Sequence, residues 1–443
     1  MKTKAWTYFF TSGTSFICLV FGCFSGIIVA RLLGPKRCGE LSVIAYFPGL
    51  IGAFFPLGLP QALTFFISKE PHRRFEIASA GFRLSLVFGI IGAIIFAFVS
   101  RYILTTENQY LAKAVTLVCL MAPAMVVNPH LYAILRGVHR FSLVNGLLIF
   151  SAGGYVLVLL GFWCTRTASA LTIAASMQCL QIATMVICVC FIGSSLFQTR
   201  VEWSTYKMCL LRGLKFWLPA LALTLFTISD RAILIRTTTL EQMGYYAAAF
   251  AVGFPFALVS ESFAQIGFVE ISGQNCHHAA SELLTRRFQM AQVVALFSVL
   301  GGLPFVYWII KIGFGAKFAP AIPVAYFVVL AMSIRGLSWV LECGLRAKNI
   351  IWSGIAASLT SFGSLVLFAV ILMPGNGAKG FGIALLFAQT LGLIVLIMAA
   401  KRSLKIPFSQ LYGIRPVIIK ALCRNLSSLI NPKSEANTYN TAT

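Results

Sequence analysis

The chain has 443 residues, of which 59% are hydrophobic and only 11% are charged, and its mean hydropathy is +0.88. Charged residues make up about 25% of a typical soluble domain, so this composition excludes a soluble globular protein. The formal net charge is +23, from 35 Lys and Arg against 12 Asp and Glu. The basic residues lie mostly in short segments between apolar runs, where we interpret them as topology signals and not as a nucleic-acid surface.

Apolar runs of about 20 residues, each long enough to cross a bilayer as a helix, recur along the whole chain. We predict an all-α polytopic membrane protein with about twelve transmembrane helices in two six-helix bundles. The predicted spans are 9–30, 41–67, 81–100, 111–134, 143–164, 169–193, 214–236, 243–268, 289–310, 320–341, 350–372 and 381–400. The first is interpreted as a retained helix, because no small-x-small cleavage site precedes Arg31.

The predicted domains are an N-terminal six-helix bundle over 1–200, a C-terminal six-helix bundle over 201–400 and a basic cytoplasmic tail over 401–443. Most Lys and Arg residues outside the spans lie on the side of the N-terminus, which places both termini in the cytoplasm. A faint internal repeat relates the halves. Arg31 precedes Gly39 by eight residues, and Arg236 precedes Gly244 by eight, and each time the Arg ends the first span of a half and the Gly opens the next span.

The tenth span carries Arg335, Trp339, Glu342 and Arg346 at steps of four, three and four, which place them on one helix face. Such a stripe in a membrane span is expected to face the bundle interior or an aqueous cavity. We therefore predict that the first three of these residues contact substrate. The alternative, favoured for Arg346, is that the charges at the cytoplasmic end of the span only extend to the membrane surface.

Four further charges lie inside predicted spans, where each costs about 2.5–3.5 kcal/mol on insertion scales. We predict that Arg83 and Arg231 contact substrate, and that Asp230 and Glu261 couple transport to a proton or cation gradient. Structural alternatives stay open for three of them. Asp230 and Glu261 are also placed to pair with a neighbouring helix, and Arg83 to anchor the start of its span.

Recognisable catalytic motifs are absent from the sequence. There is no GxxxxGK[ST], HExxH or GxSxG, no metal-ligand spacing, and only one Asp, Asp230, in the whole chain. The twelve cysteines include no CxxC and are interpreted as small hydrophobic residues. We therefore predict that the protein is not an enzyme and has neither a metal site nor a cofactor.

Four stretches resemble signature segments of one family. They are Ala30–Pro35 followed by Gly39–Leu41, the proline- and glycine-broken Phe54–Ala62, Ser229–Arg231 leading to Met243–Ala249, and Phe314–Ala321. In this order, the chain resembles the polysaccharide-flippase branch of the superfamily that also contains the multidrug-and-toxin exporters and the lipid II flippase. The resemblance covers about Phe9 to Arg402. One departure is Arg236–Thr239, where family members often carry a glycine.

The resemblance implies alternating-access export of undecaprenyl-diphosphate-linked oligosaccharide repeat units across the bacterial inner membrane, for O antigen or another surface polysaccharide. It implies as partners the lipid-linked oligosaccharide, membrane lipid, and a polymerase or other polysaccharide assembly proteins. Basic side chains facing a cavity would lower the cost of moving a diphosphate through low dielectric. Two alternatives remain: a multidrug or cation antiporter of the same superfamily, with acidic cavity residues, and a membrane polymerase of the same pathway.

Overall fold

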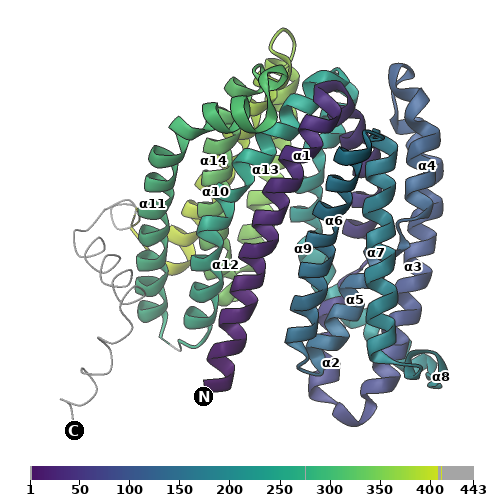
Figure 1. Ribbon diagram of the computed structural model, residues 1–443. Coiled ribbons are helices and arrows are strands. Elements are labelled where there is room, and N and C mark those ends of the chain that lie inside the picture. The colour runs from purple at the N-terminus through teal and green to yellow at the C-terminus, as the bar shows by residue number, and fades with distance from the viewer. Residues whose placement is uncertain (1, 275, 408–410, 412–443) are drawn as a thin grey trace. The chain divides into compact units, whose positions relative to one another are not determined.

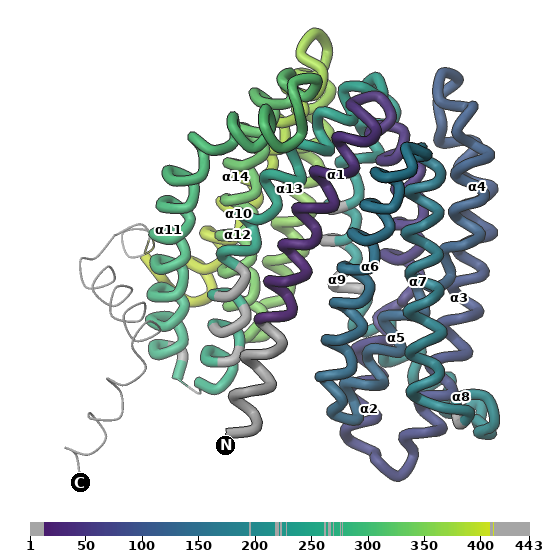
Figure 2. Tube along the Cα trace, in the orientation of Figure 1, coloured from purple at the N-terminus to yellow at the C-terminus, as the bar shows by residue number. Residues whose placement is uncertain are grey.

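The computed structural model describes the backbone of residues 2–274, 276–407 and 411 (Figures 1 and 2). Side chains at 2–12, 195, 218–220, 222–223, 227, 261–262, 265–266, 269 and 277 lie outside this description. The described residues form helices and connecting turns and contain no strand. Of the predicted tail, only 401–407 and 411 are described, and the helix that begins at Gly377 ends at Leu404.

The helices are α1 (Lys2–Phe54), α2 (Leu59–Lys69), α3 (Arg74–Ile103), α4 (Ala112–Leu120), α5 (Pro123–Gly137), α6 (Phe141–Thr165), α7 (Ala170–Ile192), α8 (Ser195–Gln198), α9 (Trp203–Thr237), α10 (Leu240–Ser272), α11 (His277–Trp308), α12 (Ala321–Ala347), α13 (Ile351–Leu372) and α14 (Gly377–Leu404). Short 3₁₀ or π turns are η1 (Pro71–Arg73), η2 (Thr106–Leu111), η3 (Ile309–Phe314) and η4 (Ala316–Phe318). Ten helical stretches of the described chain are long and apolar enough to cross a membrane. The predicted all-α, polytopic membrane fold is confirmed.

Most of the first predicted span and the first part of the second lie in the single stretch Gly13–Phe54, because α1 consists of two helices that meet at Gly34. Gly34 has φ 72° and ψ 175°, a conformation that glycine adopts without the penalty of a side chain. Pro35 follows directly and begins the second helix, where its fixed φ is favourable and its missing N–H costs nothing. The junction between these two predicted spans is therefore a kink and not an open loop.

The second predicted span is itself broken between α1 and α2. Leu57 and Gly58 both have positive φ, 46° and 68°, and Pro60 lies at the start of α2. Non-helical backbone at membrane depth is tolerated only where it is buried in protein or lines a water-filled space. We therefore expect the polar backbone at this break to be buried in protein or to line a water-filled space.

The chain divides into two compact units, each described here by itself. Unit 1 comprises Met1–Val252, Tyr307–Ala325 and Val366–Gly382, and unit 2 comprises Gly253–Val306, Tyr326–Leu365 and Ile383–Thr443. The predicted division into halves at 200 and 201 stays a prediction.

Close packing holds the helices of unit 1 together, because lipid is as apolar as the side chains and offers no hydrophobic drive for helices to associate. One apolar cluster surrounds Phe47 on α1, and another joins Leu63 on α2 to Leu131 on α5. Glycines allow the second cluster to close. Gly81 on α3 meets the Leu63 side chain, and Gly137 on α5 meets Ile67. The helices α2, α3, α5 and α9 therefore pack against one another, and they lie together in Figure 1.

Two arginines at helix ends link distant segments of unit 1. Arg31 donates from Nε to the Gly313 carbonyl at 2.6 Å, and also to the Ile312 carbonyl, where η3 ends. Arg236, its counterpart in the faint repeat, donates to the Tyr102 carbonyl at 3.2 Å near the end of α3. A cation is favourable at the carbonyl end of a helix because those carbonyls lack helical partners.

Candidate functional site

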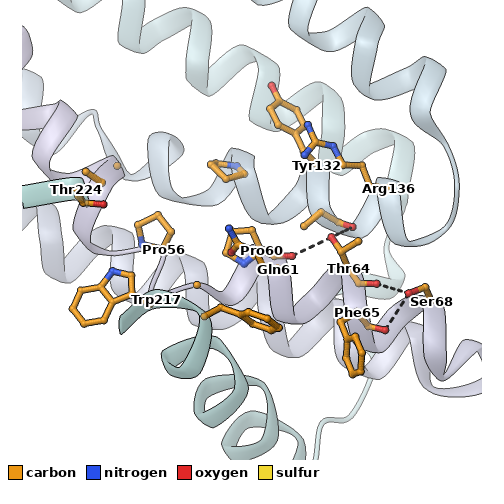
Figure 3. A pocket seen from close by; sticks show the side chains of 16 residues that line it. Pro56, Pro60, Gln61, Thr64, Phe65, Ser68, Tyr132, Arg136, Trp217 and Thr224 are labelled. Carbon is orange, nitrogen blue, oxygen red and sulfur yellow. Dashed lines mark hydrogen bonds between the residues drawn. The ribbon is translucent and has the colours of Figure 1, made fainter. Parts of the chain in front are cut away.

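A cavity of about 790 Å³ lies inside unit 1, between α2, α5 and α9 (Figure 3). Its size falls within the range of about 300–1,000 Å³ typical of small-molecule sites. The lining residues are Gly52, Ala53, Pro56, Gly58, Pro60, Gln61, Thr64, Phe65, Ser68, Pro129, Tyr132, Ala133, Arg136, Phe216, Trp217 and Thr224. The broken backbone between α1 and α2 forms part of this wall, which accounts for a non-helical stretch within a membrane span.

A glycine-to-glycine approach sets the position of α9 against this break. A Cβ on Gly58 would overlap the Gly213 carbonyl oxygen, and a Cβ on Gly213 would lie 2.8 Å from the Leu57 carbonyl oxygen. Only glycine at both positions allows the two backbones to come so close. Trp217 follows Gly213 by one helical turn, and this contact therefore places its indole at the cavity.

One face of α2 supplies polar groups to the cavity. Gln61, Thr64 and Ser68 recur at helical spacing, and Figure 3 shows them projecting from the same helix. The Thr64 hydroxyl donates to the Pro60 carbonyl at 3.1 Å, and that of Ser68 donates to the Thr64 carbonyl at 2.7 Å. These hydroxyls therefore present lone pairs to the cavity. Gln61 is exposed, and its amide makes no hydrogen bond within the described chain.

The cavity has a basic character. Arg136, in the last turn of α5, is exposed at the wall and forms no ion pair with any described residue. Arg212 lies just outside the wall, with its guanidinium carbon 4.9 Å from the ring centroid of Phe65 and 5.4 Å from that of Phe216. The described lining residues include no Asp or Glu. The site therefore favours an anionic or neutral polar ligand over a cation.

The predicted contact Arg83 lies on α3 and binds protein backbone. It donates to the carbonyls of Phe197 and Thr199, both at 2.9 Å, and to the Tyr206 hydroxyl at 3.3 Å. Ser79, one turn earlier, donates to the Leu196 carbonyl at 2.7 Å. These bonds hold the segment between α7 and α9 against α3, which is the anchoring role left open by the sequence.

Asp230 and Arg231 lie side by side on α9 but point differently. Asp230 is buried and accepts a hydrogen bond from the Tyr246 hydroxyl at 2.9 Å. Tyr246 is also buried, and its ring packs edge-on against Phe381 at 5.1 Å. The Asp230 carboxylate therefore joins α9 to α10. Arg231, in contrast, is exposed.

The four residues of the predicted stripe lie on α12 within unit 2, where Arg335, Trp339 and Glu342 are half-buried and Arg346 is exposed. Glu342 forms an ion pair with Arg346 one turn later, and Trp339 is half-buried against the apolar core of that unit. Arg335 is half-buried and has contacts of its own. Glu261 lies on α10, but its side chain falls outside the described residues. None of the seven predicted site residues is among those described as lining the cavity of unit 1.

The sequence analysis selected none of the lining residues, and the three among them with the clearest chemical role are Gln61, Arg136 and Trp217. In the sequence, Gln61 resembles an ordinary residue that forms interhelical hydrogen bonds. Arg136 resembles a loop charge that sets the topology. Trp217 is an uncharged residue within an apolar span, so the sequence does not distinguish it from other apolar residues. The available signal was the Pro56–Pro60 stretch, because a proline- and glycine-broken span beside a polar residue points to a binding site.

Solved structures with the same fold are membrane transporters. The chain matches the lipid II flippase MurJ in an inward closed conformation with a TM-score of 0.71 at 15% identity, covering 91% of this chain and 89% of that one. It matches an inward-facing MATE family multidrug resistance transporter of the MOP superfamily with a TM-score of 0.68 at 16% identity, covering 88% and 94%. A MOP superfamily transporter from Pyrococcus furiosus gives 0.50 at 13% identity, covering 92% and 94%.

The fold is thus the multi-pass helical fold of this class of transporters and flippases. No curated protein sequence matches the chain significantly. A family model described as "Polysaccharide biosynthesis protein" matches residues 4–253, more than half of the chain. The chain belongs to this polysaccharide biosynthesis protein family.

Proposed function

We propose that this protein flips undecaprenyl-diphosphate-linked oligosaccharide repeat units across the bacterial inner membrane by alternating access, for O antigen or another surface polysaccharide. The observation that carries the proposal is the cavity of unit 1. Its described wall combines the exposed Arg136, neutral polar side chains and aromatic rings, and contains no carboxylate. Membership of the polysaccharide biosynthesis family supports a glycan-containing cargo.

The chemistry of the wall suits such a cargo. A glycan presents many hydroxyls, and a broken helix with Gln61 beside it supplies donors and acceptors that a continuous apolar helix lacks. A phosphate or acidic sugar near Arg136 would be met by a planar fork of N–H donors. In this proposal Arg335, Arg231, Trp339 and Glu342 remain further substrate contacts, while the backbone contacts of Arg83 favour anchoring.

The proposed setting is the inner membrane, with both termini in the cytoplasm. The proposed partners are the lipid-linked oligosaccharide, membrane lipid, and the polymerase and other proteins that assemble the polysaccharide. The protein acts in this scheme as a transporter and not as an enzyme.

Coupling to a proton or cation gradient through Glu261 or Asp230 is a separate part of the proposal. Each carboxyl would need to change its protonation or its bound cation during transport. Asp230→Asn and Glu261→Gln should then slow translocation driven by an imposed gradient. Unchanged rates in both variants, measured in vesicles, would remove these groups from the coupling mechanism.

A multidrug or cation antiporter is the second candidate, and the cavity disfavours it. Such a site would need acidic residues to hold a cation, whereas the described lining has an arginine and no carboxylate. A polymerase of the same pathway is the third candidate. It would act on repeat units that have already reached the outer face of the membrane.

The deciding experiment uses a deletion strain of the bacterium that carries the gene. Surface polysaccharide and undecaprenyl-linked oligosaccharide are measured together, with the sidedness of the lipid-linked pool. Complete repeat units retained on the cytoplasmic side, with no surface polymer, would establish the flippase. Single units on the outer face would indicate a polymerase, and intact polymer with altered drug tolerance would indicate a multidrug transporter.

A further inference from the structure

The Trp217 indole has an unused hydrogen-bond donor at the cavity. Its Nε1 atom is buried and has no acceptor among the described residues, although the side chain lines the cavity. A buried N–H normally has a partner, because leaving it unpaired forfeits its hydration. A ligand oxygen in the cavity would supply the missing acceptor.

Aromatic surface is the second feature of this wall. Trp217, Phe216, Phe65 and Tyr132 all line the cavity, and the Tyr132 hydroxyl makes no hydrogen bond within the described chain. Aromatic side chains with a polar tip suit ligands that have one apolar face and a polar edge. A pyranose ring has this character, with C–H groups on its faces and hydroxyls around its edge.

The distribution of cations argues against the diphosphate as the main occupant. A diphosphate is best met by several convergent cationic donors. Arg136 is the single cationic side chain among the described lining residues, and Arg212 is stacked on Phe65 and Phe216 beyond the wall. One arginine with several neutral polar groups fits a sugar, or a sugar carrying one acidic substituent, better than two linked phosphates.

We propose that the cavity between α2, α5 and α9 binds the glycan of the lipid-linked substrate, with a pyranose ring against Trp217 and a sugar oxygen accepting its Nε1–H. Gln61 and Arg136 then recognise the substituents of the ring. This inference rests on the proposed function and specifies which part of the substrate binds in this cavity. Trp217 is a specificity-determining residue for the glycan.

The test measures binding to purified protein in lipid nanodiscs with three probes. They are a polyprenyl diphosphate carrying the complete repeat unit, the same polyprenyl diphosphate without sugar, and the soluble oligosaccharide. The variants are Trp217→Ala, which removes the aromatic surface and the donor, and Trp217→Phe, which keeps a smaller aromatic ring and removes the donor. Trp203→Ala is the matched control, because Trp203 lies on the same helix, is 80% exposed and does not line the cavity.

We expect Trp217→Ala to bind both glycan probes at least tenfold more weakly and the sugar-free lipid unchanged, with Trp217→Phe intermediate and Trp203→Ala like wild type. Thermal unfolding of each variant confirms that it is folded, and Trp217→Phe serves if the alanine variant is not. Equal weakening for the sugar-free lipid would place the diphosphate in the cavity and overturn the inference. Unchanged glycan binding in both Trp217 variants would also overturn it. Failure of the wild type to bind any lipid-linked probe would instead sink the proposed function.

Discussion

Gly39 on α1 and Gly244 on α10 occupy equivalent positions in one reciprocal helix crossing. A Cβ on Gly39 would overlap the Leu240 carbonyl, and a Cβ on Gly244 would overlap the Pro35 carbonyl. Leu240 precedes Gly244 by four residues, just as Pro35 precedes Gly39 by four. Each glycine therefore packs against the backbone carbonyl that lies one helical turn before the other glycine. The faint repeat in the sequence thus has a counterpart in a symmetrical contact inside unit 1.

Replacing either glycine with alanine should destabilise the protein. The atoms that a new methyl group would meet are backbone, so no side-chain rotation relieves the overlap, and overpacking of this kind costs about 1–3 kcal/mol or more. The expected result for Gly39→Ala and Gly244→Ala is a lower Tm in detergent and less protein in the membrane. Gly146→Ala is the control, because nothing lies within 4 Å of a Cβ built there. Equal Tm values for all three variants would contradict the reciprocal contact.

Arg83 offers a test between anchoring and substrate contact. Its guanidinium donates to the carbonyls of Phe197 and Thr199, and bonds from a charged donor contribute about 1.5–3 kcal/mol each. Arg83→Ala should therefore lower Tm and protein level, and reduce transport only in proportion to protein level. Arg83→Lys should recover part of the stability, because an ammonium group lacks the fork geometry. Transport lost at normal Tm would restore Arg83 as a substrate contact.

Arg335 is expected to matter for transport more than for folding. Arg335→Ala removes the charge furthest inside the α12 stripe and should reduce surface polymer at least tenfold at an unchanged protein level, if that charge meets the diphosphate or an acidic sugar. Arg346→Ala is the matched control, because Arg346 is exposed and pairs with Glu342 in the last turn of the same helix. Normal polymer in the Arg335 variant would exclude this residue from the mechanism.

Cys276 provides a prediction about pH and orientation together. Backbone N–H groups of Ala279 and His278 donate toward its sulfur and lower the pKa of this exposed thiol. A lowered pKa favours the thiolate, so maleimide labelling should rise with pH at lower values than for a free cysteine with a pKa of about 8.5. In a variant that keeps Cys276 as its sole cysteine, the dependence of the labelling rate on pH gives the pKa of this thiol.

The same cysteine reports the topology. The predicted orientation places Cys276 in the cytoplasm and Cys164, exposed at the end of α6, on the outer side. A membrane-impermeant maleimide applied to spheroplasts should label a protein with Cys164 as its sole cysteine and spare one with Cys276 alone. Inverted vesicles should give the opposite pattern. Labelling of Cys276 from outside would reverse the assigned orientation.

The helical fold could be predicted from the sequence because each span must satisfy its own backbone hydrogen bonds and is long and apolar for that reason. The kink at Gly34 was visible as a glycine followed by a proline, but hydropathy alone could not show that the helix resumes at once. The face shared by Arg335, Trp339 and Glu342 was also readable, since helical periodicity fixes it without tertiary information.

The cavity could not be predicted in the same way. The position of Trp217 depends on the approach of Gly58 to Gly213, which lie far apart in the chain, and no local pattern encodes that pairing. The sequence analysis selected charges inside spans because placing a charge in the membrane costs free energy. A hydrogen bond to a structural partner can offset that cost without any contact with substrate. Asp230 does so through Tyr246, and Arg83 through backbone carbonyls.

The composition of unit 1 has a consequence for how the protein is made. Its last segment, Val366–Gly382, leaves the ribosome ~130 residues after Val252, and most of unit 2 is synthesised in between. At about 5–20 residues per second, this interval lasts roughly 7–26 s. Throughout that time the early helices are already in the bilayer without their final partners. Biogenesis therefore includes a long-lived, partly assembled stage, during which an insertase or membrane chaperone has incomplete helix surfaces to shield.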